Sequence, residues 1–457
     1  MQLTSLTTIS PIDGRYFEST QLLRNIFSEF GYLKYRLKVE IEWFKKIMSM
    51  NKLLDIKKID NNDILFIDNV FNKFNEKDML YIKNIEKKTN HDIKALEYFL
   101  KNKLSQSKKL SYLTEFIHFA CTSEDINNIA YALMIKDALK KIILPLWLKI
   151  INILKKLSIE YKSIPLLSMT HGQPATPSTM GKEILNFYYR VKRQYKKLKN
   201  IEILAKFNGT TGNYNAHLAA YPYINWHIIS KEFIISLNLI WNPCTTQIEP
   251  HDYIAEIFAC ISLFNTILIN FNRDIWGYIS LNYFKQKLIK DEIGSSVMPH
   301  KINPIDFENS EGNLGLSNAL MNHMINKLPI SRWQRDLSDS TVLRNIGAVF
   351  SYAIIAYYSM LRGLSKLKIN SFQLLKNLNE NWSVLSEAIQ TIMRRYNIKN
   401  SYEKLKKFTR GKKISKANIY KFISDLNIPE IEKKRLKKIT PTNYIGYAIH
   451  IVEKTIE

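Results

Sequence analysis

Apolar residues recur at the three-to-four-residue spacing of helices along most of the chain, and five stretches keep this pattern for an unusual length. The spacing predicts long helices over residues 127–161, 178–204, 252–288, 312–328 and 340–364. The third has apolar residues on more than one side, which is typical of a helix buried on most of its surface. Helices this long favour a bundle, which we expect to be shared between subunits.

Shorter helical patterns with polar connections flank these long stretches. Residues 89–92 (Thr-Asn-His-Asp) precede an apolar-periodic segment and predict a capped helix start. Gly411, Pro429 and Pro441 mark breaks near the other end of the chain. We therefore expect an all-α fold with three helical domains: an N-terminal domain over residues 1–112, a central long-helix bundle over 113–364, and a C-terminal domain over 365–457.

The composition supports the helical interpretation. The 457 residues include 14 glycines and 13 prolines, too few for the many turns of a sheet protein. No secretory signal is apparent at the N-terminus, so we expect a cytoplasmic protein. The most apolar stretch, residues 257–271, is short for a bilayer and contains Asn265 and Asn270, which favours a buried helix.

The net charge of +25 is the one compositional feature that suggests a different class of protein. Such a charge is typical of nucleic-acid-binding proteins. Because the lysines are scattered in pairs such as Lys196-Lys197, we favour a solvated surface produced by compositional bias. A basic field would also attract a small anionic substrate. The cysteines, Cys121, Cys244 and Cys260, are few and widely spaced, and they suggest neither a disulfide framework nor a zinc site.

Polar residues gather in three breaks between the long helical stretches, at residues 118–125, 168–177 and 287–304. We expect these breaks to meet at one end of the bundle. In the third, Gly294 permits unusual backbone angles, two serines follow it, and Lys301 adds a positive charge. These features predict an anion-binding loop with a glycine hinge. An ordinary serine-rich linker is the alternative for a Gly-Ser-Ser sequence taken alone.

The eleven residues from Gly294 to Pro304 read GSSVMPHKINP. This string resembles the signature of the fumarase/aspartase superfamily, G-S-S-x-M-P-x-K-x-N-P, at every fixed position. The resemblance implies an all-α fold of three domains and a homotetramer with the long-helix bundle at its core. It also implies active sites built from three subunits, and a β-elimination that releases fumarate without a cofactor or a metal.

Further motifs resemble the adenylosuccinate lyase branch of this superfamily. They are Ser10 to Tyr16, Thr89 to Asp92, Thr122 to Asp125, Thr170 to Pro174 and Ser331 to Ser340. The implied substrates are adenylosuccinate, which yields AMP, and the succinylated aminoimidazole carboxamide ribotide (SAICAR), which yields AICAR. Argininosuccinate lyase or fumarase is the nearest alternative, and a basic nucleic-acid-binding helical protein is the alternative from another class. We expect no nucleic-acid or membrane partner.

The chemistry of elimination needs an acid and a base, and the motifs supply one candidate for each. His171 is the candidate acid, because histidine titrates near neutral pH. Ser295 is the candidate base, with Lys301 and the loop amides stabilising its alkoxide. Glu308 is expected to orient His171, as in related enzymes. A lone histidine in a loop is otherwise more often a surface residue.

The resemblance also implies the substrate contacts. Thr122, Ser123, Ser296, Lys301 and Asn303 should hold the succinyl carboxylates, and Arg15 and Tyr16 should face the nucleotide. Arg335, Ser340 and Arg344 should bind the phosphate, since arginine offers forked donors and residues four apart share a helix face. Surface salt bridges are the alternative for these arginines, and a helix cap is the alternative for His91. The remaining predicted contacts are Asn90, His91, Asp92, Gln247, Ile302, Asn309, Thr341, Val342 and Leu343.

Overall fold

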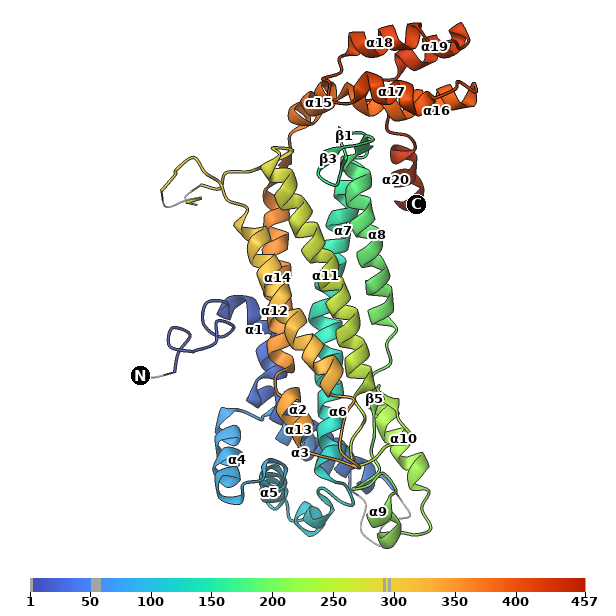
Figure 1. Ribbon diagram of the computed structural model, residues 1–457. Helices are drawn as coiled ribbons and strands as arrows, with labels where there is room; N and C mark the ends of the chain where they lie inside the picture. The colour runs from blue at the N-terminus through green and yellow to red at the C-terminus, as the bar shows by residue number, and fades with distance from the viewer. Residues whose placement is uncertain (1–2, 51–58, 291–292, 295–296, 457) are drawn as a thin grey trace. The chain divides into compact units, whose positions relative to one another are not determined.

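The computed structural model describes residues 3–50, 59–290, 293–294 and 297–456, and most of them are helical (Figure 1). The chain forms two compact units, each made of three segments. Unit 1 contains Met1–Leu146, Gln194–Thr266 and Gly312–Tyr358, and unit 2 contains Trp147–Arg193, Ile267–Glu311 and Ser359–Glu457. The predicted all-α class is confirmed. The predicted three-domain division stays a prediction.

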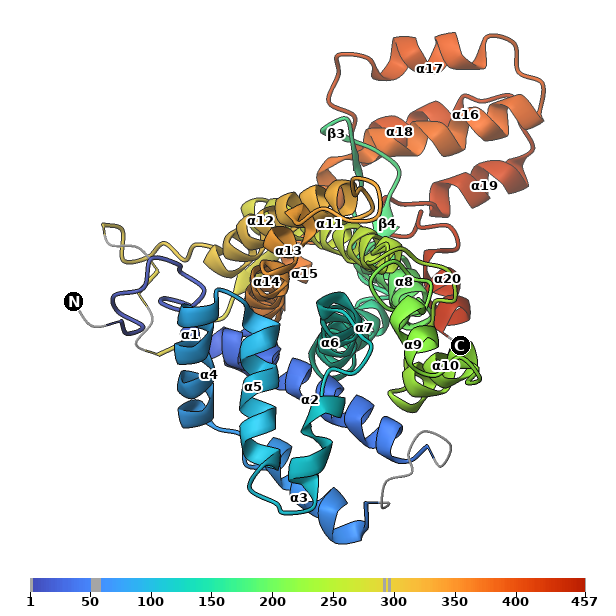
Figure 2. The same cartoon turned by 90° about the horizontal axis from the view of Figure 1, so that it is seen from below.

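Unit 1 begins with a group of helices of moderate length. They are α1 (Phe17–Phe27), α2 (Glu29–Met48), α3 (Asn61–Asn72), α4 (Glu76–Thr89), α5 (Asp92–Leu104), the 3₁₀ turn η1 (Leu110–Phe116) and α6 (Ser123–Ala138). Polar caps set several of the starts: Ser28 accepts from the Gly31 N–H at α2, and Asp60 forms a capping box with Asp63 at α3. Helix α2 packs along α6, and α4 packs against α5 (Figure 2).

Pro145 does not break the long helical stretch predicted over residues 127–161. Helix α6 passes through a π-helical turn, η2 (Leu139–Ile143), into α7 (Leu144–Glu160). Proline lacks an N–H and its ring clashes with the preceding turn of an α-helix. The wider turn, in which the Leu144 N–H bonds to the carbonyl of Leu139, is a common way to relieve such a clash.

An aromatic cluster lies in the core of unit 1. The further short elements of this unit are the parallel pair β5 (Leu204–Ala205) and β6 (Ile240–Trp241), with α9 (Asn215–Ala220), α10 (Trp226–Ser236) and α13 (Ser338–Leu343). Trp43 from α2 is fully buried, with its ring 4.1 Å from that of Phe207 and 5.1 Å from that of Phe233. Buried aromatic rings contribute large apolar areas, so this cluster anchors α2 to the segments around residues 207 and 233.

Five long helices have residues in both units: α7, α8 (Met180–Lys199), α11 (Asp252–Ser280), α12 (Ile305–Lys327) and α14 (Ile346–Lys366). Several predicted boundaries were wrong, including that of the stretch 178–204, which is helical only over α8. Helix α11 ends before residue 288, because Asn282 adopts φ 59° and leads into β7 (Phe284–Gln286). Helix α12 starts seven residues early, directly after Pro304, a residue suited to the first turn of a helix. The stretch 340–364 is divided between α13 and α14.

Helix α11 is, among the described residues, the one helix long and apolar enough to cross a membrane. Its Asn265 is fully buried and donates to the Asn318 side chain at 3.0 Å. The Tyr357 hydroxyl donates to the other end of the same amide at 2.5 Å. A buried amide satisfied by two neighbouring helices is typical of a protein core, which supports the predicted buried helix.

Unit 2 contains three short antiparallel pairs and the C-terminal helices. The pairs are β1 (Pro165–Leu166) with β4 (Ser178–Thr179), β2 (Met169–Thr170) with β3 (Gln173–Pro174), and β7 with β8 (Leu367–Ile369). The later elements are α15 (Ser371–Glu380), η3 (Trp382–Leu385), α16 (Ser386–Arg395), α17 (Ser401–Thr409), α18 (Lys416–Ser424), α19 (Glu430–Lys438) and α20 (Ala448–Ile456). Helices α16 to α19 share one apolar cluster that includes Met393, Leu405, Ile419 and Leu436.

Candidate active site

In unit 1, Thr122 and Ser123 lie at the N-terminus of α6, on a loop that is held by a buried carboxylate. The Thr122 N–H donates to Asp125 at 2.8 Å, and Thr122 and Asp125 form a capping box. Lys206 lies 2.9 Å from Asp125, and both side chains are fully buried. The N–H groups of Asn208 and Gly209 also donate to Asp125. A helix N-terminus favours anions, so the position suits the predicted carboxylate contacts.

Asp92 lies between two arginines. Its carboxylate is 2.7 Å from Arg36 Nη1 and 3.4 Å from Arg344 Nη2. Burial, the largest single influence, would raise the pKa of Asp92, but the Arg36 guanidinium, the Ile93 N–H and Arg344 together outweigh it and the pKa is lowered. The structure therefore brings together Asp92 and Arg344, two residues that the sequence predicted for the pocket. It adds Arg36, which the sequence analysis missed; the signal was a charged residue among the buried positions of α2.

Arg335 also lies among carboxylates. Its Nη1 is 2.9 Å from Glu124, its Nη2 is 3.8 Å from Asp339, and it contacts the Gln247 amide oxygen at 3.4 Å. Both predicted phosphate-binding arginines thus form ion pairs; those of Arg344 are partly exposed, as in the alternative of surface salt bridges, whereas those of Arg335 are largely buried. The pairing also holds Arg335 beside Gln247, another predicted contact. Ser340 stands on α13 with its hydroxyl bonded to the Leu337 carbonyl.

The N-terminal segment and Arg344 line a cavity of about 310 Å³ in unit 1. Ser10, Ile12, Asp13 and Arg24 contribute to its wall. The two residues predicted to face the nucleotide are not part of this wall: Arg15 is exposed, and Tyr16 is the N-cap of α1.

Other predicted contacts of unit 1 occupy helix ends. Asn90 is the left-handed C-cap of α4, with φ 52°. His91 is the N-cap of α5, and its Nδ1 accepts from the Lys94 N–H at 3.1 Å, so the cap proposed as its alternative role is present. Thr341 and Val342 lie on α13 beside Leu343, which is buried, so its side chain faces the protein core.

In unit 2, His171 lies at the tip of a two-residue hairpin between β2 and β3. Thr170 pairs with Gln173, and the two residues of the turn have φ values of 52° for His171 and 71° for Gly172. Positive φ at both central positions is the signature of a type I′ turn, which requires glycine or a tolerant residue. The turn explains why glycine follows the histidine, and it leaves the imidazole exposed.

The loop from residue 287 to 304 is described only in part, and Ser295 and Ser296 lie outside the described residues. Asn303 donates to the Gly294 carbonyl at 3.0 Å, and the Ile302 carbonyl accepts from Gln286. Lys301 is exposed. Gly294 does not adopt positive φ; a Cβ there would instead overlap the Lys301 carbonyl. The glycine predicted as a hinge therefore allows a close backbone approach.

Glu308 and Asn309 lie on α12 in unit 2. Glu308 accepts a hydrogen bond from the Trp276 indole at 3.0 Å. Among the described hydrogen bonds within the chain, none joins Glu308 to His171. The predicted orienting role of Glu308 stays a prediction.

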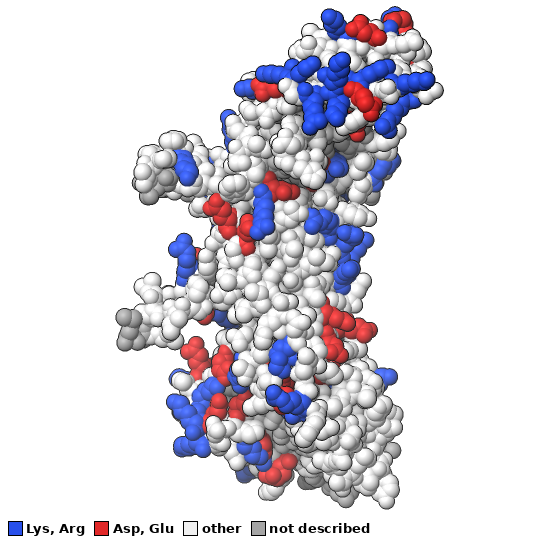
Figure 3. All heavy atoms as spheres, in the orientation of Figure 1, with Lys and Arg blue, Asp and Glu red and all other residues white. Residues whose placement is uncertain are grey.

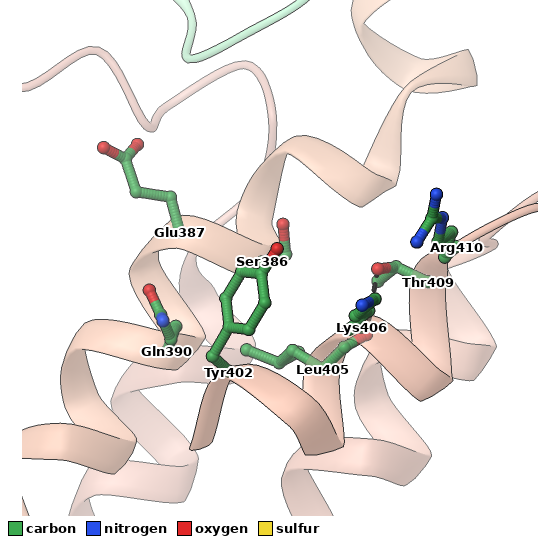
Figure 4. A pocket seen from close by; sticks show the side chains of 8 residues that line it. All are labelled: Ser386, Glu387, Gln390, Tyr402, Leu405, Lys406, Thr409 and Arg410. Carbon is green, nitrogen blue, oxygen red and sulfur yellow. Dashed lines mark hydrogen bonds between the residues drawn. The ribbon is translucent and has the colours of Figure 1, made fainter. Parts of the chain in front are cut away.

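The basic residues gather on the C-terminal helices (Figure 3). Residues 386–440 contain 16 basic and 5 acidic residues, a large share of the net charge of +25. A cavity of about 560 Å³ lies between α16 and α17, lined by Glu387 and Gln390 on one side and Tyr402 and Lys406 on the other (Figure 4). None of the predicted site residues lines it.

Comparisons with known proteins agree with these observations. A family model described as Lyase matches residues 14–317, and one described as Adenylosuccinate lyase C-terminal matches residues 331–445. The adenylosuccinate lyase of Buchnera aphidicola subspecies Schizaphis graminum is 75% identical over 99% of this chain and 100% of its own. The Escherichia coli K12 enzyme of that name is 57% identical with the same coverage.

Two solved structures share the fold at lower identity. A fumarate lyase from Mesorhizobium matches with a TM-score of 0.78 and 17% identity, over 95% of this chain and 97% of its own. A 3-carboxy-cis,cis-muconate lactonizing enzyme from Pseudomonas putida matches with a TM-score of 0.76 and 18% identity, over 97% and 98%. The fold and the matches define a helical lyase of the fumarase/aspartase superfamily. Within that class, the chain belongs to the adenylosuccinate lyase family.

Proposed function

We propose that this enzyme cleaves adenylosuccinate to AMP and fumarate, and SAICAR to AICAR and fumarate. The observation that carries the proposal is the identity of 57–75% to adenylosuccinate lyases over 99% of the chain. The basic groups around the cavity near Arg344 support it, because both substrates carry a phosphate. Fumarase and argininosuccinate lyase act on substrates without a phosphate and do not need basic groups that bind one.

The proposed chemistry is a β-elimination. Ser295, as the alkoxide, removes a proton from the carbon beside a succinyl carboxylate, and the carbanion is stabilised by hydrogen bonds to that carboxylate. The carbon–nitrogen bond then breaks, and its electron pair goes to the nitrogen, which takes a proton from His171. Lys301 and the N-terminus of α6 at Thr122 would hold the succinyl carboxylates. No cofactor takes part.

We also propose a cytoplasmic homotetramer whose active sites combine residues of three subunits. The support is the position of His171, which stands exposed on a hairpin tip, while its proposed partner Glu308 is engaged with Trp276. An acid needs its substrate and its orienting carboxylate within hydrogen-bond reach. A neighbouring subunit could supply both.

The substrate is tested by following the purine absorbance change with adenylosuccinate and SAICAR. Parallel assays measure fumarate formed from argininosuccinate or malate. We expect turnover only with the two nucleotides. Turnover of argininosuccinate or malate alone would refute the proposal.

The shared sites are tested by mixing two inactive variants, His171→Ala and Ser295→Ala. Both tetramers are dissociated, mixed and reassembled. If the two residues of one site come from different subunits, hybrids contain some sites with neither defect and regain part of the activity. Hybrids that form but stay inactive would contradict the shared sites.

A further inference from the structure

One cluster of chemically active side chains in unit 1 has no part in the proposed elimination. It consists of Glu40 on α2, with His118 and Cys121 on the loop that leads into α6. One ligand atom from each residue lies within 4.8 Å of the corresponding atoms of the other two. His118 Nδ1 is 2.6 Å from Glu40 Oε1. An oxygen, a nitrogen and a sulfur donor thus lie in one small cluster, in which His118 and Glu40 are hydrogen-bonded to each other.

The second oxygen of Glu40 points to a missing ligand. Glu40 is fully buried, and within the described part of the chain its Oε2 has no hydrogen-bond partner. Buried polar atoms almost always have a partner, and an unpaired carboxylate oxygen is costly. A cation bound beside Glu40 Oε2 would supply the missing partner.

The backbone holds the two loop residues toward Glu40. His118 and Ala120 adopt φ values of 58° and 57°, in the left-handed region that residues with a side chain rarely use. The loop is fixed on α2 by the Trp43 indole, which donates to the Phe119 carbonyl at 3.0 Å. Strained backbone that the surroundings hold in place often marks a binding position. The two left-handed residues here lie within the same short loop as His118 and Cys121.

We propose that Glu40, His118 and Cys121 form a binding site for a divalent transition-metal ion of the zinc class. Thiolate, imidazole and carboxylate are the ligands that zinc uses, and three of them with an open position suit its tetrahedral preference. His118 and Cys121 are partly exposed to solvent, whereas Glu40 is fully buried and closes the inner side.

Binding replaces protons with the metal. Without an ion, burial and the negative charge of Glu40 raise the pKa of Cys121, so sulfur carries its proton. Zinc bonds the thiolate, and that proton goes to solvent. A His118 imidazolium likewise loses its Nδ1 proton to solvent, whereas a neutral imidazole moves that proton to Nε2. The sequence could not suggest this site, because Glu40 lies 78 residues from His118 and the three cysteines are far apart.

The test uses the full-length, untagged protein, freed of metal with a chelator and titrated with Co²⁺. We expect one Co²⁺ per chain with the charge-transfer absorption of a cobalt–thiolate bond, which Zn²⁺ then displaces. Cys121→Ser should lack the absorption and bind Zn²⁺ at least about 10-fold more weakly. Cys244→Ser, which changes an exposed cysteine, is the matched control and should behave as the wild type.

Glu40→Gln is the second variant, because it leaves the thiol in place and removes only the carboxylate. It should also weaken Zn²⁺ binding at least about 10-fold. Circular dichroism and elution volume confirm that each variant is folded. A wild-type protein with no cobalt–thiolate absorption would overturn the proposal. So would an absorption that survives Cys121→Ser, or one that Cys244→Ser abolishes.

Discussion

The two groups of predicted site residues differ in how the chain supports them. Around Thr122, Asp92 and Arg335 in unit 1, almost every charged group has a partner of opposite charge, and Asp125 is fully buried among four donors. His171 in unit 2 stands exposed on a hairpin tip. Within one chain, ion pairs and hydrogen bonds therefore hold the predicted binding residues of unit 1, whereas the proposed acid is exposed.

The largest effect is expected on turnover, from a variant of His171 that should leave the stability of the fold nearly unchanged. His171→Ala should lower turnover of adenylosuccinate roughly 10³-fold, the contribution typical of a general acid. Because the side chain is exposed, the free energy of unfolding should change by less than about 0.5 kcal/mol. Steady-state rates and denaturant unfolding measure the two. A large loss of stability would show that His171 stabilises the fold, and would contradict the difference described between His171 and the paired residues of unit 1.

For the paired residues of unit 1 we expect a loss of stability instead. Lys206→Met leaves the buried Asp125 carboxylate without its cation, and removing one partner of a buried pair costs about 3–5 kcal/mol. Lys199→Met, at an exposed position of α8, is the control and should stay within about 0.5 kcal/mol of the wild type. Urea unfolding of both variants gives the difference. Equal stability of the two would mean that the buried pair adds little rigidity.

These examples show what the sequence could and could not reveal. Helical periodicity was enough to predict the all-α class, and the motif Gly294–Pro304 was enough to predict the superfamily, because both are local patterns. The pairing of Asp92 with Arg36, and of Asp125 with Lys206, was not predictable, since each joins segments 56 or more residues apart and a charged residue at a buried position does not reveal its partner. Gly294 shows a third case: the sequence predicted a glycine with unusual backbone angles, whereas the structure shows a close backbone approach, which depends on the folded loop.

The stability of unit 1 is expected to depend on pH through one buried histidine, His217. His217 is fully buried among aromatic rings, with no hydrogen-bond partner on either ring nitrogen within the described residues. Burial lowers the pKa of His217 to about 4. The unfolded chain takes up this proton near pH 6.5. Protons therefore favour the unfolded state, and stability should be complete above pH 6.5 and fall by about 2–3 kcal/mol toward pH 4.

The variant His217→Phe isolates this contribution. Phenylalanine keeps an aromatic ring in the cage formed by Trp226, Phe207 and Tyr214, and it cannot be protonated. Thermal unfolding at pH 4.5, 5.5 and 7 should show a smaller decline for the variant than for the wild type. Parallel declines would assign the acid sensitivity to other groups.

The smallest expected effect compares two glycines of unit 2 whose surroundings are equally open. A Cβ at Gly172 or at Gly277 would meet no atom within 4 Å, so the two positions differ in backbone conformation alone. Gly172 has φ 71°, and alanine there should cost about 1–2 kcal/mol of turn strain. Gly277 lies inside α11, where alanine should stabilise by up to about 1 kcal/mol. Opposite signs in urea unfolding would confirm that the type I′ turn, not crowding, requires glycine after His171.

The same two variants test the proposed role of His171 as the acid. Because displacing the acid would lower the rate, Gly172→Ala should lower turnover roughly 10-fold, while Gly277→Ala should leave it unchanged. Unaltered turnover in Gly172→Ala would mean that contacts outside the hairpin, and not the turn itself, set the position of the imidazole.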